Sequence, residues 1–451
     1  MPKLSRYNHF QPWRDGSYLA FNARSGAVAM LDTSHYKTFE QLAHKLEAQW
    51  SGPMPSEEEE LLKQLRYGSF VCDDDFSEMD WLKFEHNKAR YDVDTIGLVI
   101  APTMACNMAC AYCYESNKRG RMSDETVQAV IDFVSQRAKS LKGLEVEWFG
   151  GEPLLAVDVI ERLSRAFIDL SETHKFDYSS SIISNGYLLT AETVDRLVAL
   201  KCSSIQITLD GPSHMHNRKR PLKNGQSSFD AIIRNLQYAV RKMGVSIRVN
   251  VDKSFSAATI RELISELKQA DLQDKVWVNF GMLEAATSVC SNIAENCYGS
   301  ADFSRVEAEY FALLLQEGFR IQKLPSPTSV FCMAQQVGCF LVDPDGDLYR
   351  CFNNVGDKAK ASGHISSAVD FRHPEFNRLF SFDPFDSAEC RECSVLPLCM
   401  GSCPARRQNG HGAPEKTCDS WKYNLEPMLE IIALARQQAA AGPIAATQEK
   451  P

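Results

Sequence analysis

Between residues 96 and 282, short apolar segments alternate with longer amphipathic stretches, and this alternation constrains the fold more than any other feature. The apolar segments have the length of buried strands and span residues 96–102, 144–151, 179–186, 203–211, 245–252 and 275–282. Strands that alternate with helices form βαβ units, whose right-handed crossovers build a parallel sheet. Six strands are fewer than the eight of a closed barrel, so the sequence predicts an α/β fold with a partial (β/α)6 TIM-type barrel.

Polar or glycine-rich motifs directly follow four of these segments. A cysteine loop follows the first, Gly150-Gly151-Glu152-Pro153 the second, Ser184-Asn185-Gly186 the third and Asp210-Gly211 the fourth. In such folds the carboxyl ends of the strands meet at one edge and carry the chemistry. We therefore expect the four motifs to form a single active site.

The fifteen cysteines are unusual for a chain without signs of secretion. Its first residues, MPKLSRYNHF, lack the apolar core of a signal peptide, and no apolar run approaches the roughly 18 residues of a membrane helix. These features predict a cytoplasmic protein without a membrane partner. Clustered cysteines in that compartment more often bind metal or do redox chemistry than form disulfides. The formal net charge of −9 argues against a nucleic-acid partner.

Cys106, Cys110 and Cys113 form a compact CxxxCxxC loop after the first predicted strand. A [4Fe–4S] cluster normally takes four thiolates, so three in a tight loop would leave one iron open to another ligand. The alternatives are half of a zinc site, unrelated buried cysteines, or a chance match in a cysteine-rich chain.

The segment PTMACNMACAYCYE resembles the signature loop of the radical SAM superfamily, and GGEP resembles its turn for S-adenosylmethionine (SAM). The resemblance implies a [4Fe–4S] cluster, SAM, its reductive cleavage to a 5′-deoxyadenosyl radical, and an electron donor such as flavodoxin or ferredoxin. Asn185 could instead belong to a simple turn, and Arg248 to a surface ion pair. The residues implied for the SAM pocket are Tyr112, Gly150, Gly151, Glu152, Ser184, Asn185, Gln206, Asp210 and Arg248.

A second group of cysteines follows residue 325, and its spacing resembles the SPASM pattern of radical SAM proteins with two auxiliary [4Fe–4S] clusters. The resemblance implies three clusters in all, and two four-cysteine zinc sites are the alternative. It assigns Cys332, Cys339, Cys351 and Cys403 to the first auxiliary cluster, and Cys390, Cys393, Cys399 and Cys418 to the second. The segment LVDPDGDLYRC also predicts a hairpin with Asp345-Gly346 at its turn.

These patterns divide the chain into four expected parts. Residues 1–95 read as a small α+β module of winged-helix type for peptide recognition, with a strand pair around Arg24-Ser25-Gly26. Residues 96–325 form the barrel and residues 326–425 the cysteine-rich SPASM domain. Residues 426–451 contain a last helix and a tail, QQAAAGPIAATQEKP, whose composition predicts disorder.

The resemblance is closest to SPASM enzymes that mature ribosomally made peptides, from the N-terminal segment YNHF to Trp421. It implies hydrogen abstraction from a precursor peptide, followed by a cross-link or a related modification. A free strand edge within residues 17–31 could bind a leader peptide as an added strand, although the module could also be a purely structural cap.

Two other functions remain open at this stage. Anaerobic sulfatase-maturating enzymes, which form formylglycine, share the cysteine sets but place an aspartate directly after the hairpin cysteine. Here Phe352 and Asn353 follow Cys351, which leaves Asp343, Asp345 or Asp347 as candidates for a base. A non-catalytic metal scaffold is the third hypothesis. The sequence singles out no catalytic acid, base or radical quencher.

Overall fold

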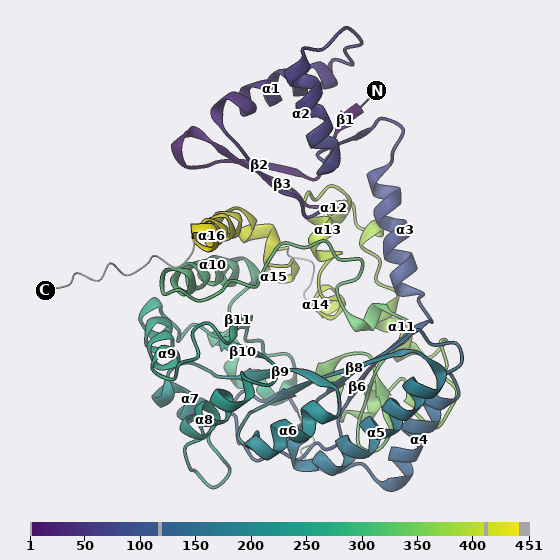
Figure 1. Ribbon diagram of the computed structural model, residues 1–451. Coiled ribbons are helices and arrows are strands. Elements are labelled where there is room, and N and C mark those ends of the chain that lie inside the picture. The colour runs from purple at the N-terminus through teal and green to yellow at the C-terminus, as the bar shows by residue number, and fades with distance from the viewer. Residues whose placement is uncertain (1, 116–119, 410–413, 442–451) are drawn as a thin grey trace, which may run out of the picture.

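The computed structural model describes residues 2–115, 120–409 and 414–441. Figure 1 shows the N-terminal module at one end, the parallel sheet with its helices at the other, and part of the cysteine-rich segment between them. The module contacts that segment directly, since Arg6 donates a hydrogen bond from Nη2 to the carbonyl oxygen of Arg391 at 2.7 Å. Gln11 similarly donates to the carbonyl oxygen of Glu426 at 3.2 Å.

The N-terminal module contains two small antiparallel sheets and three helices. Strands β2, β3 and β4 form one sheet in that order, and β1 pairs with β5. The expected strand pair around Arg24-Ser25-Gly26 is present as β3 and β4. Leu42, Leu46, Leu61 and Leu65 pack into a separate apolar core between the helices and this sheet. The elements are β1 (Pro2–Leu4), β2 (Asn8–Pro12), β3 (Tyr18–Asn22), β4 (Val28–Leu31), α1 (Thr33–Glu47), α2 (Ser56–Tyr67), β5 (Val71–Asp73) and α3 (Glu78–Arg90).

The six predicted strands are confirmed, and they run parallel in the order β11-β10-β9-β8-β7-β6. Ser123, Thr190 and Ser256 cap following helices by accepting hydrogen bonds from backbone N–H groups three residues on. The strands are β6 (Thr95–Ile100), β7 (Gly143–Trp148), β8 (Asp177–Ser184), β9 (Cys202–Thr208), β10 (Gly244–Val251) and β11 (Trp277–Met282). The helices are α4 (Asp124–Ser135), α5 (Val157–His174), α6 (Ala191–Ala199), α7 (Ser213–Lys219), α8 (Phe229–Ala239), α9 (Ala257–Gln269) and α10 (Ser300–Gln316).

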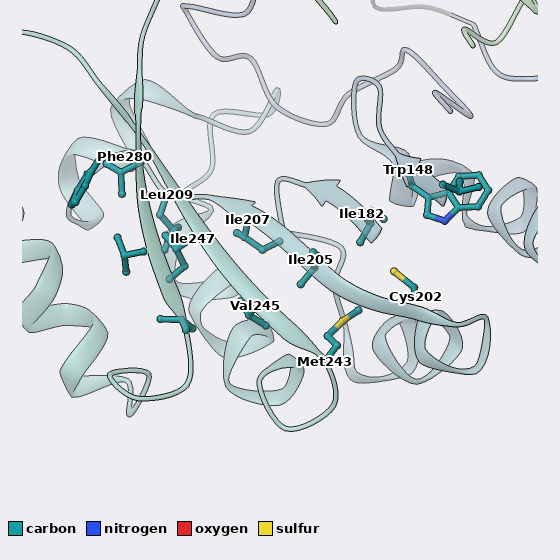
Figure 2. Packing of buried hydrophobic residues seen from close by; sticks show 14 of the residues in the cluster. Trp148, Ile182, Cys202, Ile205, Ile207, Leu209, Met243, Val245, Ile247 and Phe280 are labelled. Carbon is teal, nitrogen blue, oxygen red and sulfur yellow. The ribbon is translucent and has the colours of Figure 1, made fainter. Parts of the chain in front are cut away.

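Apolar side chains on the helix-covered face of the sheet hold the strands in register. Ile205 lies opposite Val245, and Ile207 opposite Ile247, on the paired strands β9 and β10. Figure 2 shows these side chains stacked side by side beneath the strands, with Leu209 and Phe280 continuing the layer. This continuous packing fixes the strand ends, and therefore the loops that follow them.

The sheet extends beyond the six predicted strands, because β12 pairs in parallel with β6. Its neighbours β13 and β14 are antiparallel, which makes a nine-stranded sheet. The predicted hairpin is confirmed, and Gly346 at its turn has a φ of +90°, a conformation that favours glycine. The three strands are β12 (Cys339–Val342), β13 (Asp347–Tyr349) and β14 (Gly363–His364).

The C-terminal segment consists of short helices and one long one. Helix α16 packs against α10, where Asn424 donates to Glu307 at 2.9 Å. It continues to Ala441, into the tail expected to be disordered, because its alanines favour helix; the rest of that tail lies outside the described residues. The helices are α11 (Pro374–Phe380), α12 (Ala388–Arg391), α13 (Leu396–Cys399), α14 (Pro404–Asn409), α15 (Pro414–Thr417) and α16 (Trp421–Ala441). Across the described ranges, every helix is too short or too polar to span a membrane.

Candidate active site

A cavity of about 490 Å³ lies at the carboxyl ends of the barrel strands. Of the twelve residues predicted for the cysteine loop and the SAM pocket, all but Glu152 and Asp210 line it, so three of the four strand-end motifs meet in this cavity. The predicted residues in its wall are Cys106, Cys110, Tyr112, Cys113, Gly150, Gly151, Ser184, Asn185, Gln206 and Arg248.

The cysteine loop is fixed by backbone contacts with the segment that follows α7. Ala109 donates its N–H to the carbonyl oxygen of Pro221 at 2.9 Å, and Lys223 donates to that of Asn107 at 2.9 Å. The N–H of Met108 points at the sulfur of Cys106, 3.4 Å away. Burial raises the pKa of the Cys106 thiol to about 11, so a bound metal cation would be needed to favour the thiolate at neutral pH.

The Gly150-Gly151 turn after β7 packs against the backbone of this loop. Gly151 and Glu152 donate their N–H groups to the carbonyl oxygens of Thr103 and Ala105, at 3.2 and 2.9 Å. A Cβ atom at Gly150 would collide with the Thr103 carbonyl, and Gly150 also has a φ of +116°. The glycines are therefore required for backbone to approach the cysteine loop this closely.

Glu152 is fully buried and does not line the cavity, but it holds two residues that do. Its carboxylate accepts hydrogen bonds from the Ser184 hydroxyl at 2.8 Å and from the Asn185 and Leu154 N–H groups at 2.8 and 3.1 Å. Burial raises the pKa of Glu152, and these hydrogen bonds partly oppose that rise. Glu152 therefore joins the turn after β7 to the turn after β8.

Asp210 lies behind the cavity and holds Tyr112 in place. It is fully buried, and its carboxylate accepts hydrogen bonds from the Tyr112 hydroxyl and, at 3.0 Å, from the Asn250 N–H. Arg220 donates to the same tyrosine oxygen and lies 3.6 Å from the Asp210 carboxylate. Burial raises the pKa of Tyr112 well above its usual value, so the phenol stays protonated.

Arg220 and Asn250 line the cavity but were not predicted from the sequence. Arg220 ends the basic run Arg218-Lys219-Arg220, a pattern typical of a solvated helix end, so its burial has no sequence signal. Arg248, predicted for the SAM pocket with a surface ion pair as the alternative, lines the cavity and donates from Nε to the Asn250 side chain at 2.9 Å. Other unpredicted wall residues include Tyr114, Glu115, Phe149, Thr208, Met282, Leu283 and Glu284.

Four of the C-terminal cysteines surround a smaller cavity between α12, α13 and the start of α16. They are the four that the resemblance to SPASM proteins assigns to one cluster, Cys390, Cys393, Cys399 and Cys418. Arg407 donates to the sulfur atoms of Cys418 and Cys390, at 3.4 and 3.6 Å. Burial raises the pKa of both the Cys399 and Cys418 thiols.

The other predicted set lies between the hairpin and the segment before α14. Burial raises the pKa of the Cys351 thiol to about 12, and the nearby Cys403 and Cys332 add to the rise. Cys339 shares a second cavity with Cys332, and its thiol pKa is raised to about 11, mainly by burial. Cys332 therefore lies near each of the other three thiols of the predicted set.

A single metal ion needs its ligands closer together than a cluster of several irons does. Within the described residues, no three Cys, His, Asp or Glu side chains converge on a point that one ion would occupy. The sulfur atoms of Cys290 and Cys297 contact the carbonyl oxygens of Thr287 and Ile293, each at 3.4 Å.

Comparison with known proteins gives a consistent set of relatives. Residues 100–267 match the family described as the radical SAM superfamily. Mycofactocin maturase MftC of Mycolicibacterium smegmatis is 26% identical over 337 residues, which cover 68% of this chain and 77% of the relative. The serine-type anaerobic sulfatase-maturating enzyme of Klebsiella aerogenes is 23% identical over 326 residues, 67% of this chain and 77% of the relative. An uncharacterized protein of Archaeoglobus fulgidus is 31% identical over 381 residues, 78% of this chain and 86% of the relative.

Two solved structures share the fold. The enzyme anSMEcpe with bound AdoMet and the Cp18Cys peptide superposes with a TM-score of 0.60 at 21% identity, covering 76% of this chain and 99% of that one. Streptococcus suis SuiB bound to its precursor peptide SuiA superposes with a TM-score of 0.54 at 18% identity, covering 93% of this chain and 99% of that one. At these identities the likeness establishes the fold.

The residues of the cavity fit the [4Fe–4S] cluster and SAM that this family binds. Cys106, Cys110 and Cys113 supply three thiols, and the cavity beside them leaves room for a further ligand. The turn at Gly150 and Gly151 presents bare backbone to the same space. Sequence, fold and site therefore agree that the chain belongs to the radical SAM superfamily.

Proposed function

We propose that this chain is a SPASM-type enzyme that modifies a ribosomally made precursor peptide by hydrogen abstraction from a C–H bond. When bound, a reduced [4Fe–4S] cluster and SAM supply the 5′-deoxyadenosyl radical for this reaction. The observation that carries the proposal is the single cavity in which the cysteine loop, the Gly150-Gly151 turn and the ends of β8 to β11 meet. This is where parallel α/β folds bind their ligands.

The wall of the cavity divides into groups with different tasks. Cys106, Cys110 and Cys113 would hold the cluster through three of its irons and leave the fourth for SAM. Backbone at Gly150 and Gly151, with Ser184 and Asn185, would bind the polar end of SAM. Tyr112 would lie against the ligand in an orientation that Asp210 fixes from behind.

Apolar side chains complete the cavity and would keep water from the reacting atoms. Phe149, Met282, Leu283 and Phe352 contribute to this part of the wall. Phe149 and Phe352 meet edge to face with ring centroids 5.0 Å apart, which ties the barrel to the hairpin of β12 and β13. A dry wall protects a carbon radical from side reactions.

The N-terminal module would recognise the leader part of the peptide. Strand β4 lies at the edge of its three-stranded sheet, within the residues 17–31 expected to offer a free edge. An edge strand has unpaired backbone groups that can accept an added strand. Met30 on β4 is 59% exposed and would contribute an apolar contact. The precursor-bound structure of SuiB, whose fold this chain shares over 93% of its length, is consistent with this role.

The two C-terminal cysteine sets would hold auxiliary [4Fe–4S] clusters that accept the second electron or orient the peptide. The first set, Cys332, Cys339, Cys351 and Cys403, lies nearer the hairpin that borders the main cavity. A cytoplasmic electron donor such as flavodoxin or ferredoxin would reduce the enzyme. Boundaries near residues 95, 325 and 425 would separate the peptide-recognition module, the barrel, the SPASM domain and the C-terminal helix.

Sulfatase maturation is the second candidate, supported by the relative from Klebsiella aerogenes. The position after the hairpin cysteine argues against it, since Phe352 and Asn353 line the cavity where a carboxylate base would be expected. Asp343 is not a substitute: its carboxylate accepts hydrogen bonds from the Asp345 and Asp347 N–H groups and from the Tyr349 hydroxyl.

Mass spectrometry of a short peptide encoded beside this chain, after anaerobic co-expression, tests the proposal. We expect a mass change in the peptide and, with purified reduced enzyme and SAM, release of 5′-deoxyadenosine. A sulfatase-derived peptide with its Cys or Ser serves as the matched control and should remain unchanged. Conversion of that peptide to formylglycine would favour the second candidate, and no SAM cleavage by fully loaded enzyme would exclude both.

A further inference from the structure

The side chain of Arg407 on α14 is directed at two cysteines of the second C-terminal set. Its Nη2 lies 3.4 Å from the sulfur of Cys418 and 3.6 Å from that of Cys390. Its Nε donates to the carbonyl oxygen of Gly401 at 2.9 Å, which fixes the direction of the guanidinium. The side chain is 13% exposed, so water screens these contacts little.

Two cationic and two acidic side chains line this cavity, so their net charge is close to zero. The hydrogen bonds to sulfur are then the main contribution to the electrostatic environment of the thiols. Lys422 also lines the cavity and forms an ion pair with Glu389 at 2.9 Å, and Arg407 Nη1 lies 3.7 Å from the same carboxylate. Asp419 adds a second carboxylate to the wall. Arg407 differs from these groups because it donates to sulfur directly.

The other C-terminal set contrasts with this arrangement. Arg350 is almost completely buried near Cys332 and Cys339. Its guanidinium, however, donates to backbone carbonyl oxygens, those of Cys339, Ala334 and Gln336 among them. Its hydrogen bonds therefore hold the backbone around the thiols and are not directed at sulfur.

We propose that Arg407 raises the reduction potential of the cluster held by Cys390, Cys393, Cys399 and Cys418. The inference rests on the proposed function, in which these four thiols hold a [4Fe–4S] cluster. Reduction adds negative charge to a cluster and its sulfurs, and hydrogen bonds to sulfur stabilise that charge. Arg407 is thus a positioning residue that acts through the cysteine ligands.

Helix α14 also provides a matched control. Arg406 precedes Arg407 on the same helix, but it pairs with Glu284 in the wall of the main cavity. Arg406→Gln removes the same charge from the same helix without removing a donor to sulfur. Arg407→Lys keeps the charge but replaces the planar donor with a single ammonium group.

A redox titration of the reconstituted full-length protein, followed by electron paramagnetic resonance, tests the proposal. In Arg407→Gln we expect one cluster signal to move to a more negative potential, with iron content and the other signals unchanged. Arg407→Lys should move the same signal less, and Arg406→Gln should leave it in place. An unmoved signal, an equal shift of all signals, or an equal shift in Arg406→Gln overturns the inference.

Iron analysis of the double variant Cys390→Ala/Cys393→Ala separates a failure of this inference from a failure of the proposed function, because two remaining thiols are too few to hold a four-iron cluster. If the double variant retains all the iron of the parent protein, the four thiols hold no cluster and the proposed function loses its second auxiliary site. If iron is lost there but the potential in Arg407→Gln does not move, only the inference about Arg407 fails. Loss of the cluster in both Arg407→Gln and Arg407→Lys would assign Arg407 to assembly and also overturn it.

Discussion

The cysteine loop after β6 and the Cys390–Cys418 set present thiols in two different settings. In the first, three thiols border a cavity of about 490 Å³ whose remaining wall comes from strand ends and a glycine turn. In the second, four thiols border a smaller cavity together with Arg407 and Lys422. The difference lies in the space beside the sulfur atoms: about 490 Å³ in the first case, and about 10 Å³ in the second, where Arg407 also donates to two of the sulfurs. The proposed division of roles, SAM cleavage at the first site and electron transfer at the second, rests on this difference.

The largest expected effect concerns the first setting. Cys113→Ala should lower the rate of 5′-deoxyadenosine formation by more than about 100-fold, beyond the range typical of changes outside the ligand shell. Three thiols are the minimum that holds the cluster with one iron open. Chromatography of anaerobic reactions measures the product. Cys202→Ala, which removes a buried thiol of the same barrel away from the cavity, should retain activity; equal loss in both variants would contradict the special role of the loop.

The second setting should respond differently. Cys393→Ala is expected to lower peptide modification by roughly tenfold or more while 5′-deoxyadenosine is still released, because the electron path and not SAM cleavage is damaged. Mass spectrometry of the peptide and chromatography of the nucleoside give the two rates from one reaction. Cys297→Ala is the control, since its sulfur contacts backbone groups of Ile293 and Ala285 and belongs to neither C-terminal cysteine set. Parallel loss of both rates in Cys393→Ala would erase the distinction between the two settings.

A smaller effect is expected on the stability of the hydrogen-bond network behind the large cavity. Tyr112→Phe leaves the buried Asp210 carboxylate and Arg220 short of a partner, which costs about 1–3 kcal/mol. The midpoint of urea unfolding should fall accordingly. Tyr238→Phe removes the same type of hydrogen bond, to Asp195 at 2.8 Å, at an exposed position and should change the midpoint little. Equal shifts would mean that the network behind the cavity contributes no more than a surface contact.

The smallest effect concerns the hairpin that joins the two regions. Burial raises the pKa of Asp343 to about 6, above its value in the unfolded chain. The protonated form is therefore favoured in the fold, and its stabilising contribution is complete below about pH 4 and lost as pH rises through about 6. Between pH 4 and 7 the parent protein should lose roughly 2–4 °C more in Tm than Asp343→Asn. Calorimetry of both proteins measures this, with Asp345→Asn, at the exposed tip of the same turn, expected to follow the parent.

The sequence predicts the repeating parts of this molecule well, for physical reasons that the structure makes visible. Strands β6 to β11 could be recognised because apolar residues recur at their buried positions, at every second residue in β10 for example, and the motifs at the strand ends followed. Arg220 could not be predicted, because its burial depends on Asp210 and Tyr112, which are distant in the sequence. The pairing of β12 with β6 was also missed, since a short strand after a long connection carries no sign of its partner.

That pairing has a consequence for how such a protein can be divided. A fragment that ends near residue 325 would uncover the edge of β6, a row of unsatisfied amides beside an apolar layer, and such edges invite aggregation. Gly97 on β6 has no room for a side chain because the Cys339 sulfur occupies that space, 2.8 Å from where a Cβ would lie. The barrel and the cysteine-rich segment should therefore be expressed and engineered as a single polypeptide.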